Sequence, residues 1–121
     1  METGRRTAAQ VAGGEGEDAA TALLVGNGMR IVARNYRTRF GEVDIVARDG
    51  ESLVFVEVRL RADSRFGGAA GSIGTRKRAR IAAAAREFLR QTRSNLPCRF
   101  DVVTIEAGEP RWLRAAFEMD Y

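Results

Sequence analysis

Apolar residues recur at helical spacing in two segments of the chain. In the first segment, Ala20, Leu23 and Leu24 predict a helix over residues 15–27, which ends where glycines flank an asparagine. In the second segment, a longer stripe predicts a helix over residues 76–93. The members of this stripe are Ile81, Ala84, Ala85, Phe88 and Leu89.

Alternating apolar and polar residues predict four strands. They cover residues 29–37, 42–48, 51–61 and 99–106. Asp49-Gly50 separates the second strand from the third and is a strong hairpin signal, because both residues tolerate the positive φ of a two-residue turn. Residues 62–74 are rich in glycine without an apolar pattern and are expected to form a flexible loop. Residues 112–121 carry no pattern that assigns them to an element.

The order of these elements, α-β-β-β-α-β, predicts an α/β fold in which helices flank a central mixed β-sheet. A chain of 121 residues is long enough for one domain with one hydrophobic core. We expect this single domain to span residues 15–121. Residues 1–14 contain glycine and alanine without periodicity and are expected to form a flexible N-terminal tail.

The composition excludes several kinds of site. The chain has one cysteine and no histidine, so a disulfide framework, a cysteine metal cluster, a histidine-dependent triad and a histidine-ligated zinc are all excluded. No apolar run approaches the roughly 20 residues that span a bilayer, and the N-terminus lacks the apolar core of a signal peptide. We therefore expect a cytoplasmic protein, not associated with membranes, that uses carboxylates, arginine, its one lysine, hydroxyls or a bound metal.

Positive charge is concentrated in one stretch of the chain. Residues 59–99 contain ten Arg and one Lys against two acids, a net charge of +9, whereas the whole chain carries only +4. A clustered basic segment indicates a polyanion as binding partner. The alternative is a compositional preference for arginine on an exposed helix, which the ratio of 19 Arg to one Lys also fits. The candidate nucleic-acid contacts are Arg61, Arg76, Lys77, Arg78, Arg80, Arg86 and Arg90.

Lys77 differs from the arginines of the second helix because it lies one turn before the buried Ile81. Its side chain either extends to solvent, which is the commoner arrangement, or approaches the sheet from the start of the helix. Arg86 and Arg90 instead project away from the apolar stripe, as expected for phosphate contacts.

The predicted hairpin gathers acidic side chains on one face. A turn at its Asp-Gly pair places Glu42 opposite Glu57, and both share a face with Asp44 and Arg59. Opposed carboxylates repel, and protonation, pairing with arginine or a bound cation relieves the repulsion. Carboxylate oxygens that converge on one point suit Mg²⁺ or Mn²⁺. The alternative is an edge hairpin whose acids are solvated and salt-bridged. The opposite face is expected to be apolar core and carries Val43, Ile45, Ala47, Val54, Val56, Val58 and Leu60.

A series of short motifs runs along most of the chain. It consists of Gly13-x-x-Gly16-Glu17-x-x-Ala20, Arg34-Asn35, Gly41-Glu42-Val43-Asp44, Val54-Phe55-Val56-Glu57-Val58-Arg59, Phe66-Gly67, Lys77 and Arg99-Phe100-Asp101-Val102-Val103. This series resembles the YraN-like family of predicted nucleases. That family is similar to the PD-(D/E)xK restriction-endonuclease-like fold, which includes archaeal Holliday-junction resolvases. The resemblance implies a central mixed sheet flanked by helices.

The resemblance also implies roles for individual residues. Asp44 and Glu57 are expected to bind the metal, and Glu17 to assist them directly or through water. Arg59 occupies the position of the motif's lysine; because arginine stays protonated it cannot act as a base, but it can hold a phosphate or stabilise transition-state charge. Lys77 is the alternative source of the missing lysine.

These observations lead to an expected function with two alternatives. We expect a Mg²⁺- or Mn²⁺-dependent endonuclease that hydrolyses phosphodiester bonds in DNA, with branched or structured DNA implied by the resemblance, and a homodimer would suit a two-stranded substrate. One alternative is a catalytically degenerate nucleic-acid-binding module, because the motif lysine is Arg59. The other is an interaction protein whose carboxylates pair with Arg59 and Arg61. The few aromatic residues, including Tyr36 and Phe40 near the first turn, indicate recognition of shape or backbone rather than of base sequence.

Overall fold

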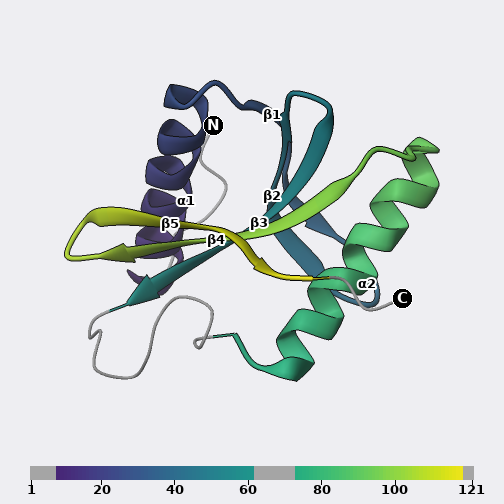
Figure 1. Cartoon of the computed structure of the whole chain (residues 1–121). Helices are drawn as coiled ribbons and strands as arrows, with labels where there is room; N and C mark the ends of the chain where they lie inside the picture. The colour runs from purple at the N-terminus through teal and green to yellow at the C-terminus, as the bar shows by residue number, and fades with distance from the viewer. Residues whose placement is uncertain (1–7, 62–72, 119–121) are drawn as a thin grey trace, which may run out of the picture.

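The structure, a computed structural model, describes residues 8–61 and 73–118 of the chain. Seven elements follow one another (Figure 1). They are α1 (Ala8–Gly26), β1 (Arg30–Arg37), β2 (Glu42–Asp49), β3 (Ser52–Arg61), α2 (Thr75–Thr92), β4 (Cys98–Glu106) and β5 (Glu109–Phe117). The predicted order of elements is confirmed, and β5 extends it by a strand that the sequence left unassigned.

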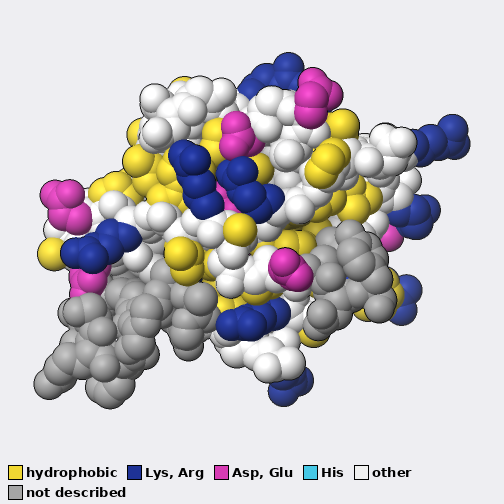
Figure 2. Space-filling model, viewed as in Figure 1, with side chains coloured by type: hydrophobic (Ala, Val, Ile, Leu, Met, Phe, Trp, Pro, Cys, Tyr) yellow, Lys and Arg dark blue, Asp and Glu magenta, His cyan; other side chains and the backbone are white. Residues whose placement is uncertain are grey.

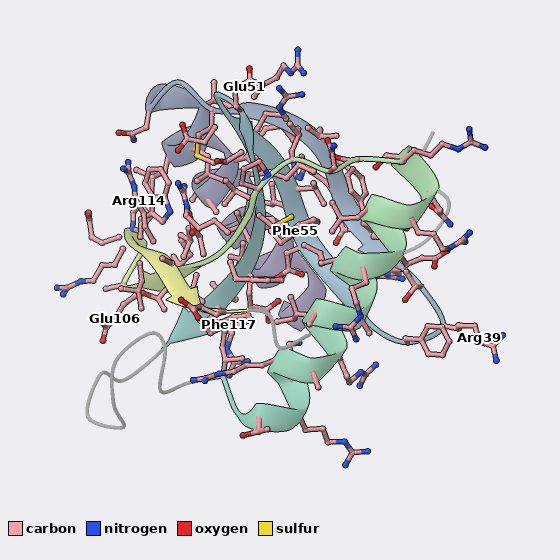
Figure 3. The ribbon with its side chains drawn as sticks, turned by 45° about the vertical axis from the view of Figure 1, so that its right-hand side comes forward. Arg39, Glu51, Phe55, Glu106, Arg114 and Phe117 are labelled. Atoms are coloured by element: carbon pink, nitrogen blue, oxygen red, sulfur yellow. The ribbon has the colours of Figure 1, made fainter. Side chains whose placement is uncertain are left out.

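The five strands form one mixed sheet in the order β1-β2-β3-β4-β5. Neighbouring strands are antiparallel except β3 and β4, which are parallel because α2 connects them as a crossover. The helices cover opposite faces of the sheet (Figure 1). Leu24 of α1 packs with Val56 on one face, and Phe88 of α2 packs with Phe55 on the other (Figure 3). This α/β arrangement is consistent with a restriction-endonuclease-like fold.

The hairpin between β2 and β3 turns one residue later than expected. Its two loop residues are Gly50 and Glu51, and Asp49 pairs with Ser52. Gly50 has a φ of 61°, as the first loop residue of a type II′ hairpin requires. Asp49 stays in the strand, where its carboxylate accepts a hydrogen bond from Arg99 Nη1 at 3.1 Å.

This later turn changes which acids meet across the hairpin. The pairing of β2 with β3 is shifted by two residues, so the position opposite Glu57 belongs to Asp44 and not to Glu42. The expected opposition of Glu42 and Glu57 is therefore wrong. Glu42 is exposed and forms an ion pair with Arg37 at 3.1 Å.

Residues on both faces of the hairpin are buried, whereas only one face was expected to form apolar core. Val43 packs in the cluster under α2, whereas Ile45 packs in the cluster under α1, so the alternation of side chains is interrupted at Asp44. Leu60 is 48% exposed rather than part of the core. The face that was expected to be mixed is covered by α2 and includes buried Val46, Leu53 and Phe55.

α1 begins at Ala8, well before the expected start at residue 15. Alanine is the best helix former, and the alanine-rich segment extends the helix without any apolar periodicity. The helix therefore includes residues 8–14, which the sequence assigned to the N-terminal tail, and residues 1–7 lie outside the described part of the chain. Glu17 consequently sits within α1 and not in its first turn.

α2 starts from a buried anchor. Ile73 is 2% exposed and packs in the core just before the helix. It lies inside the segment that was expected to form a flexible loop because it has no apolar pattern. Gly74 occupies the N-cap position of α2, and no side-chain hydrogen bond caps this end of the helix. The rest of that expected loop, residues 62–72, lies outside the described residues.

Each outer strand of the sheet is irregular. The pairing of β1 with β2 shifts in register between Ile31 and Ala33, and Asn35 follows with a φ of 54°. The pairing of β5 with β4 shifts opposite Asp101, where Ala115 has a φ of 52°. These irregularities act as β-bulges at both edges.

Gly41 lies where the β1–β2 turn touches α2. A Cβ atom at this position would lie 2.2 Å from the carbonyl oxygen of Arg80, which belongs to the helix backbone. We expect Gly41→Ala to lower the free energy of unfolding by about 1–3 kcal/mol, as measured by urea denaturation. Gly26→Ala is the control, because a Cβ there meets nothing within 4 Å. Equal stability of the two variants would contradict the close approach.

Candidate active site

The candidate site forms where β2 and β3 separate. β3 goes on pairing with β4 up to Arg61, whereas the start of β2 pairs only with β1. Asp44 and Glu57 lie at the point of separation. The backbone N–H of Val58 donates to Asp44 Oδ2 at 2.8 Å. The Asp44 carboxylate thus accepts the hydrogen bond that a backbone carbonyl of β2 would accept if the two strands stayed paired. The divergence of two strands thus brings two acids together.

The space beside these acids is a pocket of about 360 Å³. Four elements contribute its lining: α1, β2, β3 and α2. All four residues that the sequence indicated as catalytic line this pocket, together with the one lysine of the chain. The lining residues are Glu17, Asp44, Glu57, Val58, Arg59, Leu60 and Lys77.

Burial and the neighbouring carboxylate favour the protonated form of Asp44 in the absence of a cation. The side chain of Glu57 is only 5% exposed, and the Asp44 carboxyl is hydrogen-bonded to it. Burial, followed by the charge of Glu57, raises the pKa of Asp44 to about 7, although the N–H of Val58 and the charge of Lys77 oppose this increase. Negative charge in this pocket is therefore only partly compensated by the protein.

Lys77 reaches the acid pair from the first turn of α2. Its Nζ lies 3.2 Å from Glu57 Oε2, and its side chain is 40% exposed. The commoner arrangement weighed from the sequence, in which Lys77 extends to solvent, is therefore wrong. Among the described residues, Glu57 pairs with this lysine and not with Arg59, which lines the pocket without an ion pair to either acid.

Glu17 lines the pocket but is held by β1. Its Oε1 accepts hydrogen bonds from Arg34 Nη2 at 3.2 Å and from Asn35 Nδ2 at 3.1 Å. α1 lies close to the sheet here, because a Cβ on Gly16 would be 2.9 Å from Leu60 Cδ2. Arg34 and Asn35 belong to the motif series in the sequence, but their contact with Glu17 was not predicted from it. A polar pair inside a predicted strand was the available signal.

The donor set suits a hard divalent cation. No group of three or more His, Cys, Asp and Glu side chains in residues 8–61 and 73–118 is arranged to hold a metal. Mg²⁺, however, is commonly held by one or two carboxylates, with waters and substrate phosphates completing its shell. Asp44 and Glu57 supply two such carboxylates. Burial first and the charge of Glu57 second raise the pKa of Asp44, and a cation would neutralise that charge. The residues present therefore fit Mg²⁺ or Mn²⁺.

The predicted nucleic-acid contacts do not form one cluster. Arg76, Arg80 and Arg86 are exposed on α2. Arg90 is bound to Glu87 and lies 13 residues after Lys77, about 20 Å along the helix. The side chain of Arg61 is outside the described residues. On the face shown in Figure 2, Lys and Arg side chains lie singly or in pairs among hydrophobic and acidic ones.

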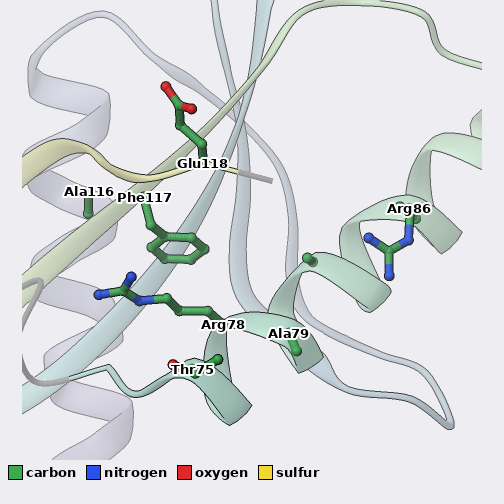
Figure 4. Close-up of a pocket in the computed structure, with 8 residues that line it drawn as sticks. Thr75, Arg78, Ala79, Arg86, Ala116, Phe117 and Glu118 are labelled. Atoms are coloured by element: carbon green, nitrogen blue, oxygen red, sulfur yellow. The ribbon is translucent and has the colours of Figure 1, made fainter. Parts of the chain in front are cut away.

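Arg78 serves packing rather than an open contact surface. Its Nε donates to the carbonyl oxygen of Ile73 at 3.0 Å, and its guanidinium lies 5.5 Å from the centroid of the Phe117 ring (Figure 4). It lines a larger pocket of about 520 Å³ between α2 and the end of β5. The charged residues of this pocket are Arg78, Arg86 and Glu118, so it lacks the paired acids of the smaller one.

The acid pair predicts a pH dependence of stability. Because the pKa of Asp44 is raised on folding, the folded protein binds a proton more tightly than the unfolded chain, and stability falls as the pH rises through about 7. We expect a loss of about 1 kcal/mol between pH 6 and pH 8 in metal-free buffer, measured by urea denaturation. The chain has no histidine that would titrate in this range. Persistence of the loss in Asp44→Asn would contradict the assignment.

Comparison with known proteins assigns the chain to a group without a described activity. A family model described as "Uncharacterised protein family UPF0102" matches residues 16–105, which include every residue of the smaller pocket. A UPF0102 protein of Janthinobacterium sp. (strain Marseille) is 47% identical over 113 residues, covering 93% of this chain and 92% of that protein. A UPF0102 protein of Xanthomonas oryzae pv. oryzae (strain PXO99A) is 52% identical over 109 residues, covering 86% and 88%. Across the described segments, neither helix has the length and apolar character to cross a membrane.

Proposed function

The chain belongs to the uncharacterised protein family UPF0102, and we propose that it is a metal-dependent endonuclease of the YraN-like, PD-(D/E)xK type that hydrolyses phosphodiester bonds in branched or structured DNA. One observation carries the proposal. Two acids, the partly buried Asp44 and the buried Glu57, meet in an open pocket with Lys77 at 3.2 Å from Glu57. Paired carboxylates can hold a divalent ion that activates water, and a cationic side chain beside them can neutralise phosphate charge, so the arrangement supports hydrolysis of a phosphodiester.

Each residue of the pocket has a distinct part in this proposal. Asp44 and Glu57 hold the divalent ion, which when bound neutralises phosphate oxygens and lowers the pKa of a water molecule. Lys77 orients Glu57 and places a positive charge beside the reacting phosphate. Arg59 binds the phosphate and stabilises the charge of the transition state, for which a permanently protonated guanidinium is suited. Glu17, fixed by β1, orients water at the rim.

The exposed arginines at the start of α2 supply contacts to the DNA backbone. Arg76 and Arg80 lie within one turn of Lys77, so among the exposed arginines of α2 they are the ones closest to Lys77 along the helix. Arg86 and Arg90 lie further along the helix, where they would contact a more distant phosphate. Such contacts carry no base sequence and depend strongly on salt.

The proposal is tested by cleavage of a labelled four-way DNA junction in the presence of Mn²⁺, Mg²⁺ or EDTA. Product that appears only with the metal supports the endonuclease. Tight, salt-sensitive binding without cleavage, together with activity gained by Arg59→Lys, would instead support the alternative of a degenerate binding module. A protein that binds neither metal nor nucleic acid at moderate salt would contradict both.

Lys77 is expected to contribute to the reaction and not to the fold. We expect Lys77→Met to lower the rate of cleavage about 100-fold, because the reacting phosphate loses a fixed positive charge. The free energy of unfolding should change little, since the side chain is 40% exposed. Arg30→Met, an exposed residue at the start of β1, removes the same charge as a control. An equal loss of rate in both variants would indicate only a general effect of net charge.

A further inference from the structure

The β1–β2 turn, residues 38–41, is fixed by its own hydrogen bonds. The N–H of Thr38 donates to the carbonyl oxygen of Gly41 at 2.8 Å. The Thr38 hydroxyl accepts from the N–H of Phe40 at 3.0 Å and from that of Gly41 at 3.1 Å. Gly41 also meets the backbone of α2 at Arg80. The turn is therefore held in one conformation and at one place beside the helix.

This turn presents an aromatic ring to solvent. Phe40 is 57% exposed, the most exposed of the large hydrophobic side chains in the described residues, and it belongs to neither core cluster. The guanidinium of Arg39 lies 5.1 Å from the centroid of its ring. Figure 3 shows Arg39 at the tip of the turn, pointing away from α2 and from the body of the protein. One exposed ring alone does not indicate a binding site. This ring, however, lies on a turn that is held by hydrogen bonds, and the Arg39 guanidinium lies next to it.

Three arginines lie in the turn or next to it. Arg39 and Arg80 are exposed, and within the described segments neither forms an ion pair. Arg37 precedes the turn and is 74% exposed, with Glu42 as its ion-pair partner. An aromatic face with cationic neighbours suits a stacked base with its phosphate, since every base offers a π-face and every phosphate a negative charge.

The turn also leads directly to the acid pair. Phe40 precedes Asp44 by four positions in the sequence, which in an extended strand is about 13 Å. Nucleotides along one strand are about 3.4 Å apart, so this distance corresponds to about four of them. The same path follows α2. Gly41 lies beside the backbone of Arg80, and the acid pair contacts Lys77, about one turn nearer to the start of the helix.

We propose that Phe40, with Arg39 and Arg80, is a stacking platform for an unpaired base, about four nucleotides from the phosphate that is cleaved. The inference rests on the proposed function and narrows its substrate to DNA with unstacked bases near a branch or an end. Stacking is tolerant of sequence, so the platform recognises an unpaired base without selecting its identity.

Fluorescence of 2-aminopurine tests the platform without any need for cleavage. The probe is placed at an unpaired position of a branched DNA, and binding is measured in EDTA. We expect the wild-type protein to quench the probe. Phe40→Ala should lose this quenching and bind the branched DNA about 5- to 150-fold more weakly, with affinity for a fully paired duplex unchanged. Phe40→Trp should retain both properties, and Val25→Ala, at an exposed residue of α1, should behave as wild type.

The outcomes separate this inference from the proposed function. Wild-type quenching and affinity in Phe40→Ala would overturn the platform, whatever the cleavage assay shows. Phe40-dependent binding to vesicles of anionic lipid, with no effect on DNA, would overturn the choice of nucleic acid as the occupant. Phe40-dependent quenching in a protein that never cleaves DNA would support the platform and overturn only the endonuclease.

Discussion

Asp44→Asn is expected to reduce metal-dependent cleavage of branched DNA at least about 1,000-fold, equivalent to about 4 kcal/mol of transition-state stabilisation. The substitution removes one of the two negatively charged donors in the pocket and keeps the size of the side chain. The amide oxygen can still accept the hydrogen bond from Val58 N–H. The amide N–H can donate to Glu57, as the protonated carboxyl of Asp44 does in the wild type. Folding should therefore be preserved while the site loses its cation.

Stability and metal binding make this prediction specific. At pH 8 the variant should be at least as stable as the wild type, because the repulsion between the carboxylates of Asp44 and Glu57 is gone. Calorimetry should show weaker Mn²⁺ binding. Glu42→Gln is the matched control, since the register of the hairpin turns this exposed acid away from Glu57. Cleavage by Asp44→Asn within tenfold of the wild type, or an equal loss in Glu42→Gln, would refute the two-acid site.

Asp101→Ala is expected to have the largest effect on stability. The Asp101 side chain is 0% exposed and accepts four hydrogen bonds. Two come from Arg99, at 2.9 and 3.0 Å, one from Trp112 Nε1 at 2.9 Å and one from the N–H of Ala115 at 2.9 Å. Its loss leaves the partly buried Arg99 guanidinium with Asp49 as its remaining carboxylate partner and leaves the indole N–H of Trp112 without this acceptor. We expect the free energy of unfolding to fall by about 3–5 kcal/mol.

Trp112 provides the measurement for this prediction. It is the only tryptophan of the chain, and its indole N–H donates directly to Asp101, so its fluorescence reports both unfolding and the lost contact. Asp49→Ala is the control, because it removes the other acid bound to Arg99. The side chain of Asp49 is 40% exposed. That change should cost less than about 1 kcal/mol. Similar losses in both variants would show that Asp101 is not the anchor of this network.

Local periodicity predicted most elements of the fold but not its ends. The first four strands and α2 are visible in the sequence because each has a regular apolar pattern, whereas the start of α1 has only its alanines. β5 was missed for a different reason. Its hairpin turns at Ala107-Gly108, where both residues have positive φ, and alanine at such a position gives no turn signal.

The candidate site shows where sequence reasoning ends. Asp44 and Glu57 were predicted to share a face, but the predicted register placed Glu42 opposite Glu57. The register depends on whether Asp49 lies in the strand, and Arg99, fifty residues later, contacts Asp49 there. The contact of Lys77 with Glu57 likewise depends on how α2 packs, which helical spacing alone does not determine.

The bulges in β1 and β5 affect how copies of this protein can associate. A regular outer strand exposes a row of free backbone donors and acceptors, onto which a second molecule can add its own strand. Kinks near Asn35 and Ala115 break these rows on both sides. Two copies are therefore poorly suited to join into one continuous ten-stranded sheet, and the same kinks oppose stacking into fibrils. A homodimer would have to form through helices or turns.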